Sequence, residues 1–334
     1  MPFRQIVGNR HLLELIGRAA SRGTLPPSLI FAGPEGVGKR MTAVALAQLM
    51  NCLEPGKFDG LDACGACVSC KRIARGVHAD TLMIEPGDTG AIKIDQVREA
   101  IERSAYKPFE GRRRVVILND AEALNAEAQN ALLKTLEEPP AASTFILVTS
   151  RPDMLLPTVL SRCQRLRFGR LSPGEVADVL MRDHEYAKSD AHAAASLADG
   201  SIGRALEGGT DEFVDAREAA TELLEAVATT SDPWRRLGGA KTLAGAARGG
   251  SDREELARRL YALSSIIRDL GVLLSRADER CLANADLRAR LERLLRSFDG
   301  ERTLRAFSAI DRALAALDRN ASPKIVADWL AFQI

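Results

Sequence analysis

The amino-acid sequence predicts an α/β domain built on a five-stranded parallel sheet, followed by a small helical domain and a larger all-helical one. Short, nearly all-apolar runs alternate with helix-length segments up to about residue 168, and from "LSPGEVADVLMRDHE" onward apolar residues recur three and four positions apart. The first pattern is typical of a parallel sheet covered on both faces. The second is typical of amphipathic helices. A chain of 334 residues also suits two or three domains better than one core.

Five runs are predicted as strands: SLIFAGP (28–34), TLMIEP (81–86), RRVVILND (113–120), STFILVTS (143–150) and CQRLRF (163–168). The segment "LNAEAQNALLKTLEEPP" is predicted to form a capped helix that the paired prolines 139 and 140 stop. Glycines at 200, 203, 208 and 209 punctuate the helical half. The predicted domains are therefore 1–168, 169–208 and 209–334.

Composition and charge exclude several classes of protein. Lys and Arg number 46 and Asp and Glu 45, which gives a formal net charge of +1, so no overall field draws the chain to nucleic acid or membranes. Any DNA contact must be local. No stretch approaches the roughly 18 apolar residues of a membrane span, and the first residues lack the plan of a signal peptide. We therefore expect a cytoplasmic protein, in which thiols stay reduced.

The stretch "GPEGVGKR" (33–40) follows the first predicted strand and nearly matches a phosphate-binding loop. Gly33, Gly36, Gly38 and Lys39 satisfy the Gly-x4-Gly-Lys pattern, in which backbone N–H groups and the lysine hold phosphates. Arg40 stands where Ser or Thr should hold Mg²⁺, and a guanidinium has no lone pair for a metal. The loop is predicted not to position a catalytic metal, while nucleotide binding itself stays open.

A hydroxyl two residues later, on Thr42, points about 200° away around the helix and is not expected to replace the missing ligand. The third strand should end in an Asp-Glu pair that holds the metal and polarises water. The pair found there is Asn119-Asp120, or Asp120-Ala121 in the other alignment. Either alignment lacks a catalytic carboxylate. An ordinary strand with a polar end is the alternative interpretation.

Four cysteines follow the loop, in "CLEPGKFDGLDACGACVSC": Cys52, Cys64, Cys67 and Cys70. Their spacing predicts a closed structural zinc site in a module at about 52–70, because four thiolates complete a tetrahedron and leave no open position. Scattered reduced thiols are the alternative. Cys163 and Cys281 lie far away and are expected to be packing residues, and His78 finds no vacant ligand position.

These motifs resemble the AAA+ clamp-loader family of bacterial replication, replication factor C-like, and within it the delta-prime branch of the DNA polymerase III holoenzyme. The marks are "GPEGVGK", the cysteine insertion, "NAEAQNALLKTLEEPP", "FILVTS" and "LSRCQRLRF", in this order. The resemblance covers residues 3 to about 208 by motif, and the helical remainder by plan. It implies a P-loop AAA+ domain, a helical lid (169–208) and a helical collar (209–334) that holds a ring together.

The resemblance also implies roles for single residues. "SRC" carries an arginine finger in that family, so Arg162 would stabilise charge on a γ-phosphate bound to a neighbouring subunit. Thr149 or Ser150 would be the polar sensor. A second sensor arginine is displaced, since Gly203 occupies its position and Arg204 follows one residue late. The resemblance further implies that Ile6 and Val7 would line an adenine pocket, if one remains, and ordinary packing is an equally good explanation of both residues.

The implied function is a non-hydrolysing delta-prime (stator) subunit that supplies Arg162 in trans and helps load the sliding clamp onto primed DNA. Implied partners are gamma/tau and delta subunits in a hetero-pentameric ring, the clamp and primer-template DNA, with no membrane. Structural Zn²⁺ is expected, and ATP or ADP turnover by the chain itself is not. Two alternatives remain: a self-contained AAA+ ATPase that tolerates Arg40, and a zinc-dependent DNA-binding module.

Three features outside the motifs have two interpretations each. Trp234 and Trp329 are interpreted first as core residues, with a role as interface anchors as the alternative. "GRRR" (111–114) is interpreted as an arginine-rich strand edge rather than a DNA contact. The cysteine segment "CGACVSCKRIARG" supplies only three basic residues, fewer than a DNA-reading surface needs.

Overall fold

A computed structural model describes residues 2–55, 60–87, 90–207, 210–229, 232–245, 252–277, 282–319 and 321–334. The chain forms two compact units, Met1–Leu171 and Ser172–Ile334. The division of the second unit near residue 208 stays a prediction. Cys281 and the glycines at 208 and 209 lie outside the described residues.

The first unit is built on the predicted parallel sheet, with strands in the order β2-β3-β4-β1-β5. The strands are β1 Ser28–Ala32, β2 Thr81–Ile84, β3 Arg114–Leu118, β4 Ser143–Thr149 and β5 Gln164–Arg167. Every neighbouring pair is parallel. All residues of β1, β3 and β4 are buried, which explains why these runs are continuously apolar rather than alternating.

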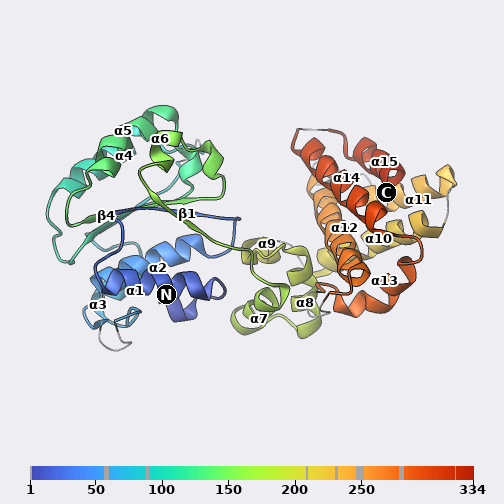
Figure 1. The fold of residues 1–334 in the computed structure, drawn as a ribbon, viewed down its shortest axis with the longest axis horizontal. Helices are drawn as coiled ribbons and strands as arrows, with labels where there is room; N and C mark the ends of the chain where they lie inside the picture. The colour runs from blue at the N-terminus through green and yellow to red at the C-terminus, as the bar shows by residue number, and fades with distance from the viewer. Residues whose placement is uncertain are drawn as a thin grey trace. The chain divides into compact units, whose positions relative to one another are not determined.

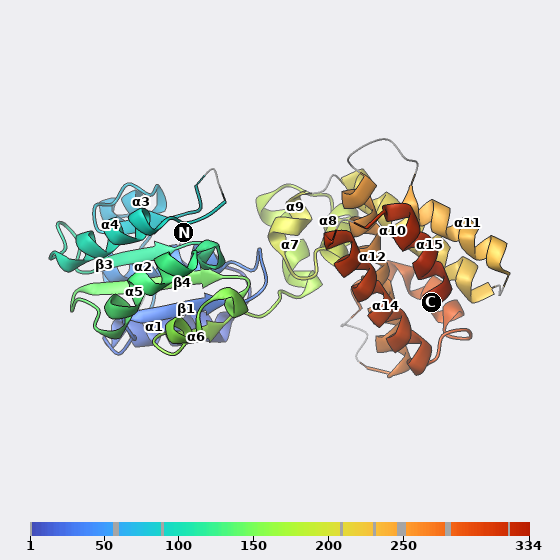
Figure 2. The same cartoon turned by 90° about the horizontal axis from the view of Figure 1, so that it is seen from above.

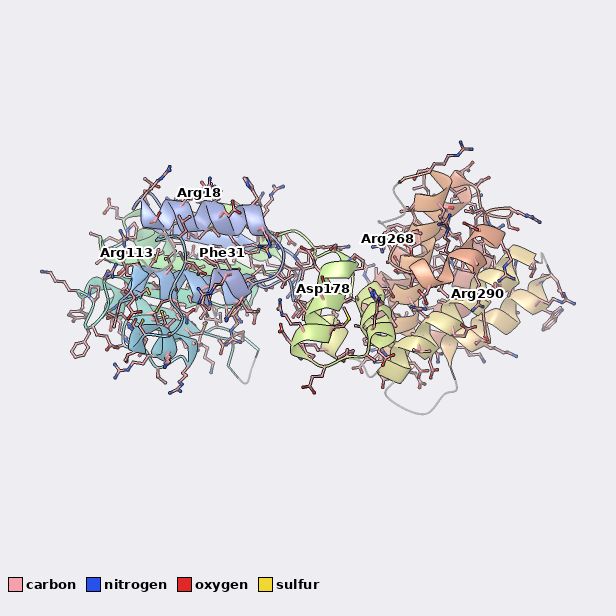
Figure 3. The ribbon with its side chains drawn as sticks, turned by 90° about the horizontal axis from the view of Figure 1, so that it is seen from below. Arg18, Phe31, Arg113, Asp178, Arg268 and Arg290 are labelled. Atoms are coloured by element: carbon pink, nitrogen blue, oxygen red, sulfur yellow. The ribbon has the colours of Figure 1, made fainter. Side chains whose placement is uncertain are left out.

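Helices cover both faces of the sheet (Figure 1). On one face lie α1 Arg10–Ser21, α2 Lys39–Asn51 and α3 Val68–Ala74, and on the other α4 Ile94–Ala105, α5 Ala126–Glu137 and α6 Pro157–Leu160. Two separate apolar cores result. Phe31 of β1, labelled in Figure 3, belongs to the first core, and its ring lies 5.2 Å from that of Phe168.

Local sequence signals place the helix ends. Asn125 accepts a hydrogen bond from the Ala128 N–H and begins α5, as the capped-helix prediction requires. Short 3-10 helices lie at η1 Phe3–Gln5, η3 Ala121–Ala123, η4 Pro152–Met154 and η6 Ala285–Leu287. Because the strands are parallel, the segments that follow β1, β3 and β4 meet at one edge of the sheet. That edge is where open α/β sheets bind ligands.

The second unit is helical throughout its described residues, as predicted (Figure 2). Its helices are α7 Pro173–Asp183, α8 Lys188–Leu197, α9 Ile202–Glu207, α10 Thr210–Thr229, α11 Pro233–Ala244, α12 Asp252–Leu274, α13 Arg288–Leu294, α14 Gly300–Asp318 and α15 Pro323–Gln333. Helix α12 packs against α10 and α14. Arg290 of α13, labelled in Figure 3, pairs with Glu218 and Glu225 of α10 and joins these helices.

The core interpretation is wrong for one of the two tryptophans. Trp234 is 82% exposed, because it lies in the first turn of α11, on a side that no described helix covers. Trp329 is half-buried and stacks under the Arg312 guanidinium, 4.7 Å from the ring centroid. Among the described helices, none is both long and apolar enough to cross a membrane.

Candidate functional site

The predicted phosphate-binding loop lies between β1 and α2. Gly36 and Gly38 have φ values of 71° and 90°, in the left-handed region that favours glycine. Gly33 has a different reason to be glycine, since a Cβ there would come within 2.4 Å of the Phe168 carbonyl oxygen. Ile6 is buried, and its Cγ2 lies 3.6 Å from where a Cβ on Gly38 would be, so Ile6 packs against the loop. Its role in an adenine pocket stays a prediction.

Lys39 is turned back onto its own loop. Its Nζ donates hydrogen bonds to the carbonyl oxygens of Gly33, at 2.8 Å, and Pro34, at 2.6 Å. Only 7% of the residue is exposed, and burial lowers the pKa of its ammonium, against the opposing effect of Glu122, Glu35 and Asp120. Two of the three N–H donors of this ammonium are thus used within the loop itself.

The residues that should hold Mg²⁺ are engaged elsewhere. Arg40 extends to Glu85, just beyond the end of β2, with Nη2 2.8 Å from Oε1. Thr42 is fully buried, and its hydroxyl donates to the Gly38 carbonyl at 2.9 Å. The position of Thr42 agrees with the prediction that its hydroxyl cannot replace the missing ligand, because a hydroxyl bonded one turn back points along its own helix.

The end of β3 brings Asn119 and Asp120 beside the loop. Asp120 adopts a left-handed conformation with φ 52°, and the Asn119 Nδ2 donates to its Oδ2 at 3.0 Å. Burial raises the pKa of Asp120, and the nearby carboxylates Glu122, Glu35 and Glu85 raise it further. These four carboxylates outnumber Lys39 and Arg40, so the side chains around the loop disfavour a polyanionic ligand that arrives without a cation.

Glu122 is a site residue that the motif comparison missed. Its Oε1 accepts hydrogen bonds from the Ser150 N–H, at 3.0 Å, and from the Ser150 hydroxyl, while its Oε2 is buried without a partner among the described residues. Burial opposes ionisation, but the bonds from Ser150 and Thr149 lower the pKa of Glu122. The left-handed turn at Asp120 brings Glu122 to this edge. An acid two residues past the expected pair was the only signal in the sequence.

The polar end of β4 is therefore already occupied. Thr149 is buried, and its hydroxyl accepts a hydrogen bond from the Arg151 N–H at 3.1 Å, while Ser150 is held by Glu122. Either residue lies at the edge expected of a phosphate sensor. Both have structural partners there, so a satisfied strand end explains them equally well.

Arg162 lies on the surface between α6 and β5. Its Nε and Nη2 lie 3.2 and 3.1 Å from Glu137 Oε2, at the end of α5, and its Nη1 donates to the Thr158 carbonyl at 3.1 Å. The arginine side chain is 31% exposed and that of Glu137 60%. An exposed pair of this kind contributes only about 0–1 kcal/mol, so Arg162 can leave Glu137 at little cost.

Arg204 is engaged within the second unit. Its guanidinium lies 5.1 Å from the centroid of the Tyr261 ring on α12 and 3.9 Å from Asp199. Gly203, which occupies the position of the second sensor, offers no side chain. The arginine that follows one residue late is thus held against α12.

The four predicted ligands of the cysteine module come together. The Sγ atoms of Cys52, Cys64, Cys67 and Cys70 all lie within 4.8 Å of one another. A tetrahedral zinc with bonds of about 2.3 Å requires sulfurs about 3.8 Å apart, so the cluster fits such an ion. The N–H groups of Cys64, Cys67 and Cys70 donate to the sulfurs of Cys52, Cys64 and Cys67 at 3.3, 3.3 and 3.4 Å.

The thiols differ in their tendency to ionise. Burial opposes ionisation of Cys67, but hydrogen bonds from the backbone of Cys70 and Leu53 lower its pKa to about 7. Burial raises the pKa of Cys70 and of Cys52. A bound divalent cation would deprotonate such thiols.

Two other candidates are excluded from the cluster. His78 is buried with its Nε2 3.2 Å from the Ser69 hydroxyl, and its Nδ1 accepts from the Asp80 N–H at 3.1 Å, so both ring nitrogens are engaged. Cys163 is buried in the other core, where burial raises its pKa to about 12. Its expected packing role is confirmed.

Comparison with known proteins shows what the chain is similar to. Residues 8–172 match the family described as DNA polymerase III, delta subunit. The chain is 32% identical over 215 residues to DNA polymerase III subunit delta' of Bacillus subtilis, an alignment that covers 64% of this chain and 63% of that protein. The matched half of the chain is therefore similar to DNA polymerase III clamp-loader subunits. The chain is also 32% identical over 244 residues to DNA polymerase III subunit tau of Salmonella typhimurium, an alignment that covers 70% of this chain and 37% of that protein.

The chain thus spans between about a third and two thirds of the length of these two relatives. A solved gamma subunit-related protein of Thermotoga maritima is 19% identical, with a TM-score of 0.40, and the alignment covers 96% of this chain and 97% of that one. Relatives of both the delta' and the tau type occur at similar identity. Which of these two types the chain represents must therefore be argued from the site.

Proposed function

We propose that this clamp-loader subunit is a delta-prime (stator) subunit, which does not hydrolyse ATP itself. The arrangement around Lys39 carries the proposal: the lysine is bound to its own loop, and Arg40 stands at the position of the metal ligand, tied to Glu85. If the expected Asp-Glu pair is aligned with Asn119-Asp120, Asn119 lacks the carboxylate that should hold the metal. If it is aligned with Asp120-Ala121, Ala121 lacks the carboxylate of the base. Hydrolysis requires these parts together, since the metal holds the phosphate while the base orients the water that attacks it.

Its contribution to catalysis would be Arg162, supplied in trans. A positive charge aimed at the γ-phosphate of a neighbouring subunit stabilises charge that develops as the bond to the leaving group breaks. The weak, exposed pair with Glu137 holds the arginine near the surface without sequestering it. The partners on this proposal are gamma/tau and delta subunits in a hetero-pentameric ring that loads the sliding clamp onto primer-template DNA.

We further propose that Cys52, Cys64, Cys67 and Cys70 hold structural zinc. The ion would supply a cross-link between the end of α2, where Cys52 lies, and α3, which contains Cys70. The chain itself orients the thiols through their N–H bonds, with Cys67 capping α3 by accepting from the Cys70 N–H. Four protein sulfurs leave no position for substrate, so the site is structural rather than catalytic.

Glu122 supports a second candidate, a self-contained AAA+ ATPase. Glu122 places an ionised carboxylate beside the carboxyl ends of β3 and β4, where the expected Asp-Glu pair is missing. The position argues against it as a base, because Oε1 is taken by Ser150 and Oε2 is buried. For the chain to act as such an ATPase, Glu122 would have to leave Ser150 and accept a hydrogen bond from the attacking water instead.

The arginine-finger proposal is tested by Arg162→Ala in a reconstituted loader. DNA-stimulated phosphate release should lose a large share of its rate, since an arginine finger contributes about 10³–10⁵ at the site it serves in GTPases. Arg165→Ala is the matched control, because Arg165 is an exposed arginine three residues away on β5. Turnover unchanged by Arg162→Ala, or equally lowered by Arg165→Ala, would contradict the proposed role.

A further inference from the structure

Two basic segments that are separated in the sequence lie side by side in the first unit. One is α3 and the residues after it, with Lys71 and Arg75, and the other is the loop 106–113 that leads into β3. Arg72 pairs with Glu110 of this loop at 2.6 Å. On the other side of the module, the Arg112 Nη2 donates to the Cys52 carbonyl at 2.7 Å. The structure therefore adds to the cysteine module the basic residues that its own segment lacks.

Buried side chains hold the loop 106–113 in one conformation. The carboxylate of Asp80 accepts hydrogen bonds from the N–H groups of residues 109, 110 and 111 at 2.8, 2.8 and 2.7 Å. The Asn51 Oδ1 accepts from the next two N–H groups, those of residues 112 and 113, at 2.8 and 3.0 Å. Five consecutive amides are thus fixed, so the side chains of the loop project from a preorganised backbone.

The same loop exposes two large aromatic side chains. Phe109 is 86% exposed and Tyr106 73%. We define the module surface as Lys71, Arg75, Tyr106, Lys107, Phe109 and Arg113. Arg113, labelled in Figure 3, directly precedes β3 and so lies at the amino end of that strand, whereas the phosphate-binding loop follows the carboxyl end of β1.

The charge of this surface differs from that of the chain. The whole chain carries a formal net charge of +1, but the module surface contributes four cations, and Glu110, the acid of the loop, is already paired with Arg72. A local cluster of cations attracts a polyanion even when the net charge is close to zero. Cations alone would suit any acidic partner. The two exposed rings on the loop 106–113 are what distinguish the partner.

We infer that the module surface binds a single strand of nucleic acid. Aromatic rings beside cations form a platform on which unpaired bases stack while the phosphates meet the lysines and arginines. A duplex hides its bases, and an acidic peptide has none to stack, so neither would explain two rings held out on a fixed loop. The inference does not depend on the proposed stator role, because it concerns the other edge of the sheet.

The experiment is fluorescence anisotropy of the full chain with labelled dT20 and, in parallel, labelled rU20. Phe109→Ala should weaken binding about 5- to 150-fold, the loss expected when one stacked base loses its ring. Trp234→Ala is the matched control, since Trp234 is as exposed, at 82%, but lies in the other unit. Preference between dT20 and rU20 decides which strand the surface takes, and either preference supports the inference.

Salt dependence separates the two kinds of contact. Lys107→Ala should reduce the slope of log K against log salt by about 0.7, the value for one phosphate contact to a single strand, whereas Phe109→Ala should leave the slope unchanged. No binding of either strand by the full chain, equal loss in Trp234→Ala, or tighter binding of a duplex or of polyglutamate than of dT20 and rU20 would overturn the inference.

Discussion

Asp80 is a buried charge on which the loop 106–113 and the start of β3 both depend. Its side chain is fully buried and lies 2.7 Å from the Arg114 guanidinium. The same carboxylate also accepts hydrogen bonds from three backbone N–H groups of the loop. Burial alone would raise the pKa of Asp80. The bonds from Arg114 and from the loop amides outweigh burial and lower it to about 2.

The pKa shift sets the magnitude of the expected effect. Lowering the pKa from the ordinary 3.8 to about 2 corresponds to about 2 kcal/mol of folded-state stabilisation. Because the folded pKa lies below the unfolded one, this stabilisation is fully present above about pH 5 and is lost as the pH falls through 3.8 toward 2. Asp80→Asn removes the charge and also leaves Arg114 buried without its carboxylate, which in other buried pairs costs about 3–5 kcal/mol.

Hydrogen exchange of the β3 amides measures this cost within the first unit. Asp80→Asn should lower their protection near pH 7 by at least about 30-fold, the factor that corresponds to about 2 kcal/mol. Both tryptophans, Trp234 and Trp329, lie in the second unit, so tryptophan fluorescence follows that unit alone. Its unfolding transition should not move if the substitution acts locally.

Asp153→Asn is the control, because Asp153 is exposed in η4 of the same unit, and it should change stability by less than about 0.5 kcal/mol. The reasoning is refuted if Asp80→Asn leaves protection of β3 within twofold of the wild type. It is also refuted if the difference in stability between the wild type and Asp80→Asn does not shrink as the pH is lowered from 5 toward 2.

Two further predictions concern the metal and the loop. Cys64→Ser should abolish zinc binding measured by metal analysis of the purified chain, whereas Cys163→Ser, in the other core, should retain one ion per chain if the four-sulfur site is correct. Arg40→Ser restores the hydroxyl of a phosphate-binding loop, yet phosphate release should stay at background, because Asn119 still lacks the carboxylate. Release that rises with this single change would place the defect in Arg40 alone.

The sequence predicted the sheet because its strands are buried on both faces. A run such as "VVIL" carries that burial in every residue, so neither register nor neighbours are needed to recognise it. The cysteine cluster was equally predictable, since ligand spacing is a local property. The glycines of the phosphate-binding loop predict the turn onto which Lys39 folds. They do not predict the hydrogen bonds from Lys39 to two carbonyl groups of that loop.

What the sequence did not predict depends on contacts between distant segments. Glu122 reaches the carboxyl end of β4 only because Asp120 adopts a left-handed conformation. An Asp residue can adopt this conformation, but its presence in a sequence does not predict it. The approach of loop 106–113 to the cysteine module depends on Asn51 and Asp80, two polar residues whose burial no periodicity marks. Trp234 was misassigned because hydrophobicity does not reveal which side of a helix is covered.

The central claim is that this chain keeps the shape of an ATPase without the reaction. The most direct test incubates the purified chain with ATP and Mg²⁺ and measures nucleotide binding and phosphate release together. We predict no release above background, with or without binding, because the metal ligand is replaced by Arg40 and Lys39 is held by its own loop. Steady turnover that Lys39→Ala abolishes would contradict the account and make the chain a motor in its own right.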